Sequence, residues 1–295
     1  MSEKTTAAVA TPLKKKSQLL DIWRRLRRNK TAVLGLTIFL TMAIIAIAAP
    51  LIYDYKTDVI KLNYQAKLQG PSVTNPFGTD EMGRDMLARV IWGARMSLSL
   101  GFVTVAFALS IGGTLGAIAG YFGGKLDNVI MRIMDIFLAI PNILFAICIV
   151  AALGPSTINL VIAMAVSSCP TYARVVRGPV LTVREVEYIE AAKAIGANSG
   201  TIILSHVLPN CMAPIIVQTT LNVAGTILSI AGMSFLGLGI QPPTPEWGSM
   251  LSSARNYIRD YSYMAFFPGV AIMITILSLN LFGDGLRDAL DPRLK

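Results

Sequence analysis

Charged side chains are scarce in this chain. They make up 15% of its 295 residues, whereas a soluble domain carries about 25%. Hydrophobic residues account for 54%. A helix that crosses a bilayer needs about 20 mostly apolar residues, so the chain can supply several such helices. This composition argues against a soluble enzyme, a disordered chain and a disulfide scaffold, and it indicates a membrane protein.

Histidine and cysteine are scarce as well. The single histidine, His206, nearly excludes a histidine-based catalytic triad or a multi-histidine metal site. Cys148, Cys169 and Cys211 lie far apart, in or beside apolar stretches, and form no CxxC pair. We therefore expect apolar packing roles for the cysteines. We expect no catalytic site, no metal site and no cofactor.

Charge is absent from five long stretches of the sequence, at 31–53, 96–124, 136–173, 194–245 and 261–283. A charged side chain at the bilayer centre costs about 2.5–3.5 kcal/mol on insertion scales, so such stretches are typical of membrane spans. We predict an all-α, polytopic membrane bundle. Its six transmembrane helices are expected at about 32–53, 97–121, 129–153, 157–176, 213–240 and 264–283.

Lysine and arginine are concentrated before the first predicted span. Because the cytoplasmic ends of spans carry the excess of positive charge, residues 1–31 are expected to be a basic cytoplasmic segment. Six spans then place the loop 177–212 and the tail 284–295 inside as well, and the loop 54–96 outside. Two weaker alternatives are a cleaved signal peptide ending near Ala48 and a nucleic-acid partner for the basic segment. Topology already explains the charge, so no nucleic-acid partner is expected.

The centres of the predicted spans contain no ionisable groups, which argues against a carrier driven by protons or ions. Arg132 and Asp135 enter a span only near its cytoplasmic start, where their i,i+3 spacing allows them to pair. The segment 123–125 lacks the first glycine and the final Ser/Thr of a phosphate-binding Walker A loop. A stand-alone secondary carrier or channel and a membrane-embedded enzyme are the weaker alternatives. The chain is expected to draw energy from a partner.

The segment between the fourth and fifth spans carries a helical pattern. Four residues recur at helical spacing: Tyr188, Ala191, Ala192 and Ile195. They predict a short amphipathic helix. Gly196 is expected to end or bend this helix, because glycine accepts backbone angles that other residues resist. A second short helix is expected at about 199–207, before Pro209. An ordinary cytoplasmic loop is the plainer alternative.

This segment resembles the loop signature of the permease subunits of binding-protein-dependent ABC importers. The signature is Glu-Ala-Ala, three residues, Gly, nine residues and Ile-x-Leu-Pro. The matching residues are Glu190, Ala191, Ala192, Gly196, Leu208 and Pro209. The chain departs from the signature at one position, because His206 stands in place of the Ile.

Three further segments, 75–85, 235–248 and 283–292, are similar to the dipeptide/oligopeptide/nickel permease family, and in it to the C-type dipeptide permease subunit. The resemblance covers nearly all of 20–295. It implies the type I ABC importer permease fold, with a five-helix core at 97–283 and a cytoplasmic coupling helix. That helix would dock on an ATPase through the six residues that match the loop signature.

The same resemblance implies the setting of the chain. It implies a multi-pass protein of the bacterial inner membrane that forms a heterodimer with a sister permease. Two ABC ATPase subunits and an extracytoplasmic solute-binding protein would complete the importer. ATP hydrolysis would then occur on the ATPases and not on this chain. The implied cargo is small peptides, delivered by the binding protein, and nickel complexes or glutathione are alternatives.

Polar residues of the fifth span are candidates for lining the translocation pathway or for bonding to neighbouring helices: Gln218, Thr219, Asn222 and Ser229. Outside the membrane, Glu246 and Trp247 lie in a proline-rich loop. They are candidates for contact with the binding protein, although Trp also commonly marks a membrane interface. In the second span, Gly112, Gly116 and Gly120 are spaced four apart and predict a small-residue face for close helix packing.

Overall fold

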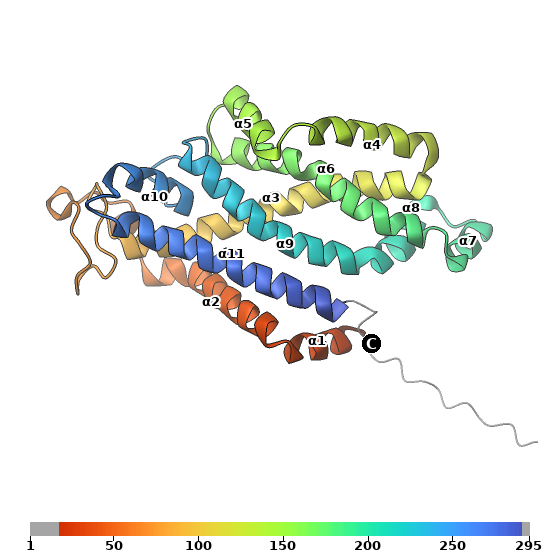
Figure 1. Cartoon of the computed structure of the whole chain (residues 1–295), viewed down its shortest axis with the longest axis horizontal. Coiled ribbons are helices and arrows are strands. Elements are labelled where there is room, and N and C mark those ends of the chain that lie inside the picture. The colour runs from red at the N-terminus through yellow and green to blue at the C-terminus, as the bar shows by residue number, and fades with distance from the viewer. Residues whose placement is uncertain (1–17, 291–295) are drawn as a thin grey trace, which may run out of the picture.

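The computed structural model describes residues 18–290, which form helices and loops and no β-strand (Figure 1). In this part of the chain, five helices are long and apolar enough to cross a membrane. They are α2 (Lys30–Ile52), α3 (Met86–Phe122), α6 (Thr157–Val183), α9 (Leu208–Phe235) and α11 (Tyr263–Leu290). The prediction of an all-α membrane bundle is confirmed.

The third predicted span is broken. It consists of α4 (Gly124–Leu138) and α5 (Asn142–Leu153), which meet at a bend of 83°. Pro141 lies in the break, directly before α5. Proline lacks a backbone N–H and disfavours helical geometry in the residue before it, which explains why the helix stops here. Counted as one broken span, α4 and α5 bring the total to the six that were predicted.

Helix α3 begins at Met86, well before the predicted start at residue 97. Asp85 caps it, because its carboxylate accepts hydrogen bonds from the backbone N–H of Leu87 at 2.7 Å and of Ala88 at 3.0 Å. With 37 residues, α3 is about 55 Å long, whereas the hydrocarbon core is about 30 Å thick. Its length therefore allows its first turns to extend beyond the membrane, where they carry neighbouring loops.

Helices α3 and α6 pack through their backbones, as the glycine spacing predicts. A Cβ atom at Gly112 would collide with the carbonyl oxygen of Cys169, and one at Gly116 with that of Ala173. Further along, a Cβ at Gly120 would also meet α6 within 3.0 Å. Small residues on such a face let membrane helices approach closely enough for extensive van der Waals contact. The three glycines therefore fix the separation of α3 and α6.

The shorter elements gather at the two ends of the bundle (Figure 1). One end holds α7 (Glu187–Ala194), α8 (Ser199–Ile202) and η3 (Ile203–Val207). The other end holds η1 (Tyr55–Val59), η2 (Tyr64–Ala66), α10 (Trp247–Ala254) and η4 (Arg255–Tyr257). Helix α1 (Gln18–Arg28) and the final turn of α11 lie toward the α7 end (Figure 1), as an even number of crossings requires. We call these the α7 end and the α10 end.

We predict that Gly116→Ala destabilises the bundle by about 1–3 kcal/mol, because the added methyl group overpacks the backbone contact with α6. The matched control is Gly178→Ala. No atom lies within 4 Å of its Cβ position, so this change is expected to be neutral or stabilising by up to about 1 kcal/mol. Thermal unfolding in detergent, followed by size-exclusion chromatography, measures both. Equal midpoints for the two variants would refute the assigned role of Gly116.

Candidate functional site

The predicted coupling helix is present as α7, and one side of it is buried. Ile189 and Ala192 point into an apolar cluster that joins α7 to the helices of the bundle. The cluster also contains Ala117 and Tyr121 of α3, Val176 and Val180 of α6, and Cys211 and Ile215 of α9. Glu187 and Glu190 lie in the first turn, where negative charge stabilises a helix N-terminus. Helix α7 is therefore seated on the ends of α3, α6 and α9.

The prediction that Ala192 contacts an ATPase needs correction. Its side chain is 8% exposed and packs inside this chain. Glu190 and Ala191 are exposed, as a docking role requires. Tyr188 and Ile195 share the outer side with Ala191, and Ile195 is 85% exposed. Residues at i, i+3, i+4 and i+7 lie on one side of a helix, so the spacing alone does not separate Ala192 from the outer residues. Ile195 was assigned to the amphipathic helix from its spacing, but it was not among the predicted docking residues because the family signature does not include it.

Gly196 ends α7, as expected from the sequence. Its φ is +81°, a value that side-chain-bearing residues rarely adopt. The backbone N–H of Gly196 donates to the carbonyl of Lys193 at 3.0 Å, and that of Ala197 donates to the carbonyl of Ala192 at 3.1 Å. These two bonds form a Schellman motif. No atom lies within 4 Å of a Cβ placed at Gly196, so the backbone angle alone selects glycine here.

Leu208 and Pro209, the last residues of the loop signature, begin α9. Leu208 is half-buried and packs against the cluster that holds α7. Pro209 is exposed and lies in the first turn of the helix, where its missing N–H would have no intrahelical partner in any case. His206, which replaces the Ile of the signature, is exposed. Leu208 thus anchors the segment, and Pro209 sets the start of α9.

Three of the four candidate pathway residues share one side of α9. Gln218, Asn222 and Ser229 are half-buried and recur at helical spacing. The side-chain amide of Gln218 donates to the Asn222 carbonyl oxygen at 3.1 Å. Gly225 and Gly232 lie on the same side, and neither has an atom within 4 Å of its Cβ position. We call this side the polar face of α9, and it is open within this chain.

Thr219 does not belong to the polar face. Its hydroxyl is buried and forms no hydrogen bond within the described residues. The hydroxyl of Tyr172, on α6, is also buried, and it lies near Asn222 without a hydrogen bond of normal geometry. The structure therefore groups Gln218, Asn222 and Ser229, and separates Thr219 from them.

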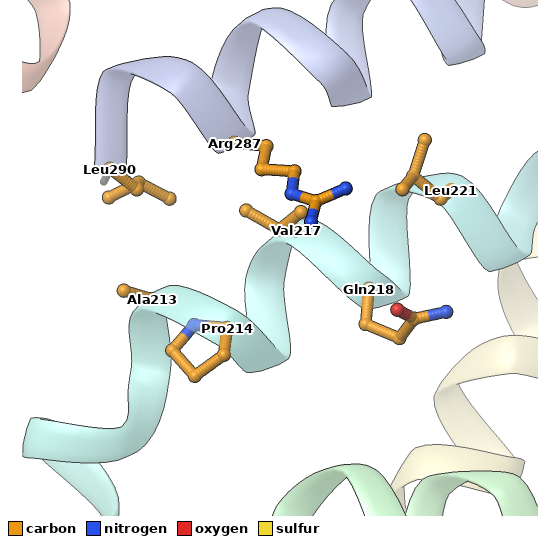
Figure 2. Close-up of a pocket in the computed structure, with 7 residues that line it drawn as sticks. All are labelled: Ala213, Pro214, Val217, Gln218, Leu221, Arg287 and Leu290. Carbon is orange, nitrogen blue, oxygen red and sulfur yellow. The ribbon is translucent and has the colours of Figure 1, made fainter. Parts of the chain in front are cut away.

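A cavity of about 400 Å³ opens between α9 and α11 toward the α7 end (Figure 2). It is lined by Ala213, Pro214, Val217, Gln218, Leu221, Arg287 and Leu290. The two helices cross closely beside it, because a Cβ at Gly283 would lie 2.6 Å from Leu221 Cδ2. Beyond this crossing, Arg287 extends from α11 toward Val217 of α9 (Figure 2). The cavity continues the polar face, since Gln218 belongs to both.

Two ion pairs join α4 to α6 and correct the pairing expected from the sequence. Asp135 pairs with Arg174 at 2.6 Å and not with Arg132 on its own helix. Asp127 forms a bidentate pair with Arg177, at 2.5 Å from Nε and 2.6 Å from Nη2. Such a geometry is among the stronger charge-assisted contacts. Both arginines come from another helix, which a local spacing rule does not reveal.

At the α10 end, Glu246 is fully buried and caps α10. Its carboxylate accepts hydrogen bonds from the backbone N–H of Gly248 at 2.9 Å and of Ser249 at 2.8 Å. The hydroxyl of Ser97, on α3, donates to it at 3.2 Å. Burial raises the pKa of Glu246 above its usual range, although these hydrogen bonds favour the ionised form. The carboxylate is buried and hydrogen-bonded within this chain, which argues against direct contact with a binding protein.

Trp247 is also fully buried. Its indole Nε1–H donates to the Val90 carbonyl at 3.0 Å. Its ring lies against α3, where a Cβ at Gly93 would approach Trp247 Cδ1 to 2.8 Å. Trp247 therefore wedges α10 against α3 and presents no surface to a partner. Both predicted binding-protein contacts, Glu246 and Trp247, are thus buried structural residues at the α10 end.

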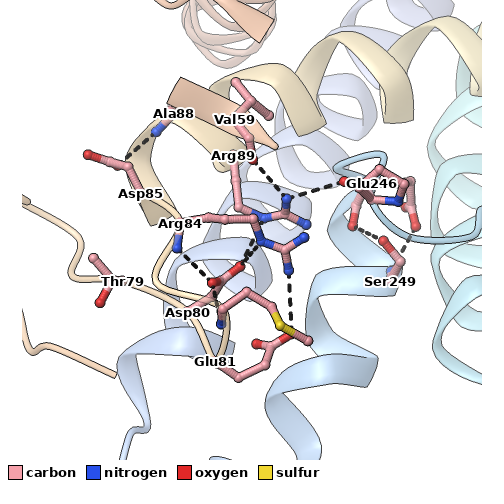
Figure 3. A network of polar contacts seen from close by, with 12 residues as sticks. Val59, Thr79, Asp80, Glu81, Arg84, Asp85, Ala88, Arg89, Glu246 and Ser249 are labelled. Atoms are coloured by element: carbon pink, nitrogen blue, oxygen red, sulfur yellow. Dashed lines mark hydrogen bonds and ion pairs between the residues drawn. The ribbon is translucent and has the colours of Figure 1, made fainter. Parts of the chain in front are cut away.

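A buried network of charges fastens the loops of the α10 end to the start of α3 (Figure 3). Asp80 forms ion pairs with Arg84 at 2.6 Å and with Arg89 at 3.4 Å. Arg89 Nη1 also donates to the carbonyls of Val59 at 3.1 Å and Pro243 at 3.3 Å. Arg89 thus connects two loops that are distant in the sequence, one containing Val59 and the other Pro243. This contact gives the residues at 75–85 a structural role.

The sequence comparisons define the class of this protein. Residues 112–295 match the family described as "Binding-protein-dependent transport system inner membrane component". Residues 17–71 match the "N-terminal TM domain of oligopeptide transport permease C". The chain belongs to this family of inner-membrane permease components, and it is a multi-pass membrane protein that serves as a transport subunit.

The chain is similar to known permease subunits, and each alignment covers nearly the whole length of both proteins. The chain is 50% identical to the "Dipeptide transport system permease protein DppC" of Alkalihalophilus pseudofirmus, over 93% of this chain and 90% of the relative. It is 45% identical to the "Di/tripeptide transport system permease protein DppC" of Pseudomonas aeruginosa, over 95% and 93%. It is 43% identical to the "Glutathione transport system permease protein GsiD" of an Escherichia coli strain, over 97% and 95%.

A solved structure supports the fold. The inward-facing MetNI methionine ABC transporter contains a chain that matches 70% of this one with a TM-score of 0.56. The match covers 98% of that chain at 21% sequence identity. At this identity the likeness concerns the fold alone. The expected ABC importer permease fold is thereby confirmed.

We predict that Trp247→Ala costs about 3–5 kcal/mol of stability, because it leaves a cavity between α10 and α3. Trp247→Phe fills most of that space and loses the hydrogen bond to Val90, so about 1 kcal/mol is expected. Trp23→Ala is the matched control, because Trp23 is exposed. Thermal unfolding in detergent measures all three. A stable Trp247→Ala protein that loses only its response to a binding protein would restore the contact role.

Proposed function

We propose that this chain forms, with a sister permease, the membrane passage of an ATP-driven importer of small peptides. Two of the relatives described above are named for dipeptide or di/tripeptide transport and are 45–50% identical to this chain along almost all of its length. That identity is the observation that carries the proposal. Glutathione is the second candidate cargo, because a relative with 43% identity is named for it. Glutathione is itself a small peptide, so both candidates belong to one chemical class.

The polar face of α9 supports a passage shared with a second subunit. Gln218, Asn222 and Ser229 are only half-buried, and the glycines between and beside them face open space. Polar side chains are costly against lipid, so a polar face on a membrane helix needs a protein partner or a water-filled path. A sister permease that presents a similar face would enclose such a path. The cavity beside Arg287 would then be its exit.

The outer side of α7 is suited to docking on an ATPase subunit. Tyr188, Ala191 and Ile195 form an exposed apolar strip beside Glu190, while Ile189 and Ala192 fix the opposite side to the bundle. A helix that is held on one side and bare on the other can pass a push from a partner to the spans as rigid-body motion. One ATPase on each permease gives two in the importer.

We propose that the α7 end is cytoplasmic and that the α10 end faces the binding protein. The excess of Lys and Arg before α2 supports this orientation. Because Glu246 and Trp247 are buried, contact with a binding protein would fall on exposed residues at the α10 end. Tyr64, Val73 and Ile258 are apolar side chains that are open there.

Uptake by the reconstituted importer tests the proposed function. The complete assembly, in vesicles with its binding protein, is expected to accumulate labelled dipeptides and tripeptides only when ATP is supplied to the ATPases. A free amino acid is the control and should not accumulate, and parallel assays with glutathione separate the two candidate cargoes. Peptide uptake by this chain without ATP or partners would instead identify a stand-alone carrier.

The orientation predicts which positions react with a membrane-impermeant thiol reagent in intact cells. In a variant without Cys148, Cys169 and Cys211, the change Ser199→Cys at the α7 end should react only after the membrane is opened. Val73→Cys, fully exposed at the α10 end, should react in intact cells. The opposite pattern would reverse the topology.

We predict that Ile195→Asp weakens binding of the ATPase subunits by about tenfold or more, as the loss of a central apolar contact does. Its side chain is exposed, so the thermal stability of the permease pair should not change. Ala192→Trp is expected to lower that stability, because its side chain faces the apolar cluster. ATPase co-purification and unfolding midpoints distinguish the two effects.

Two controls complete this experiment. Ile258→Asp makes the same change at the α10 end and should leave ATPase binding intact. Gly196→Val strains the end of α7 by about 1–2 kcal/mol through its positive φ, whereas Gly200→Val in α8 lacks that strain. Retention of the ATPases and of transport by both Ile195→Asp and Gly196→Val would show that α7 has no coupling role.

A further inference from the structure

Helix α1 has two chemically different sides. The side chains described from residue 22 onward place Ile22 and Leu26 against the bundle. Trp23, Arg27 and Arg28 are exposed. At 100° per residue, Trp23 and Arg27 lie 40° apart on the helix, and Arg28 follows at 140° from Trp23. One side of α1 is therefore apolar and buried, and the other combines an indole with guanidinium groups.

The buried side attaches α1 firmly to α2 and α11. Leu26 packs in a cluster with Ala32 of α2 and Ala289 of α11. Asn29, between α1 and α2, caps α2 and donates from its side-chain amide to Asp288 at 3.3 Å. A Cβ at Gly285 of α11 would collide with Ala32, so the helices are in close contact. Helix α1 is thus part of one body with α2 and α11.

The exposed side of α1 carries Trp23, Arg24, Arg27 and Arg28 around an open hollow on the surface. Arginine presents several N–H donors in a plane and binds phosphate oxygens in pairs. Tryptophan favours the level of the lipid headgroups, where its ring is in the hydrocarbon boundary and its N–H is hydrated. The lining thus matches a ligand that is anionic at one end and apolar at the other.

We propose that this side of α1 binds the headgroups of anionic phospholipids at the same membrane surface that α7 faces. The position of α1 beside the start of α2 places its arginines where the membrane span begins. A basic segment next to a span gains about 1 kcal/mol per Lys or Arg from an anionic leaflet. The indole of Trp23 inserts beside the acyl chains while Arg27 and Arg28 hold the phosphate. This site is independent of the cargo.

The test uses the complete importer in phosphatidylcholine vesicles that contain a small fraction of lipid brominated near the headgroup. Bromine quenches the fluorescence of a tryptophan that it contacts. The signal of Trp23 is the difference between the native importer and its Trp23→Phe variant. We expect brominated phosphatidylglycerol to quench this signal at a much lower fraction than brominated phosphatidylcholine. The preference should be about fivefold for each arginine, the factor that corresponds to roughly 1 kcal/mol.

The double variant Arg27→Gln/Arg28→Gln is expected to remove most of this preference, and high salt should weaken it. The matched control is Arg255→Gln/Arg259→Gln, which removes the same charge at the α10 end and should leave the preference intact. Equal quenching by the two lipids would show an interface contact without headgroup binding and would overturn the proposal. Absence of quenching by either lipid would show that another subunit covers Trp23, and it would overturn the proposal as well.

Discussion

The backbone contact between α3 and α6 is the constraint on which the other features depend. Apolar residues cannot drive helices together in lipid, which is as apolar as they are, so close packing must supply the attraction. Gly112 and Gly116 supply it by removing the side chains that would separate the helices. Helix α3 also supports both ends of the bundle. Trp247 wedges against its start, and α7 rests against its end.

This arrangement explains why α7 has one buried side and one exposed side. Ile189 and Ala192 face the ends of α3 and α6, whose separation is already fixed by the glycines. A force applied to the exposed strip around Ile195 would therefore move two spans together and not bend one of them. The Schellman motif at Gly196 ends α7 and turns the chain back toward α9 within two residues.

The sequence was sufficient for features that depend on local chemistry. Uncharged stretches predicted the spans, because charge in the bilayer is costly. Gly196 predicted the end of α7, because few residues tolerate its backbone angle. The spacing of the α3 glycines predicted a packing face. The break at Pro141 was missed because the hydropathy of 129–153 is high enough for one uninterrupted span.

Features that depend on distant residues could not be predicted in this way. A glutamate and a tryptophan in a proline-rich loop suggest exposure, and only the fold shows that Ser97 and Val90 of α3 complete their environment. The start of α3 was predicted too late because the uncharged stretch begins only at residue 96. The earlier start is possible because Asp80 and two distant carbonyls surround the charge of Arg89. Ala192 was misassigned because the family signature gives a residue type and not the direction of its side chain.

The close crossing of α9 and α11 divides the bundle in a way that relates the separate sites. On the α10 side of Gly283, the two helices share one apolar core. On the α7 side they separate around the cavity that holds Arg287. There, the start of α9 belongs to the cluster that seats α7, whereas the end of α11 is fixed to α1 and α2.

The cavity therefore lies between two bodies that are held from different directions. In the arrangement proposed above, one body would receive the push of an ATPase through α7. The other would be held at the membrane surface through the arginines of α1. Relative motion of the two about the Gly283 crossing would widen or narrow the cavity while leaving the outer end packed, because that end is fastened by the buried Asp80 network and by Trp247. The proposed exit at the α7 end could therefore open without loss of the contacts that hold the loops at the α10 end.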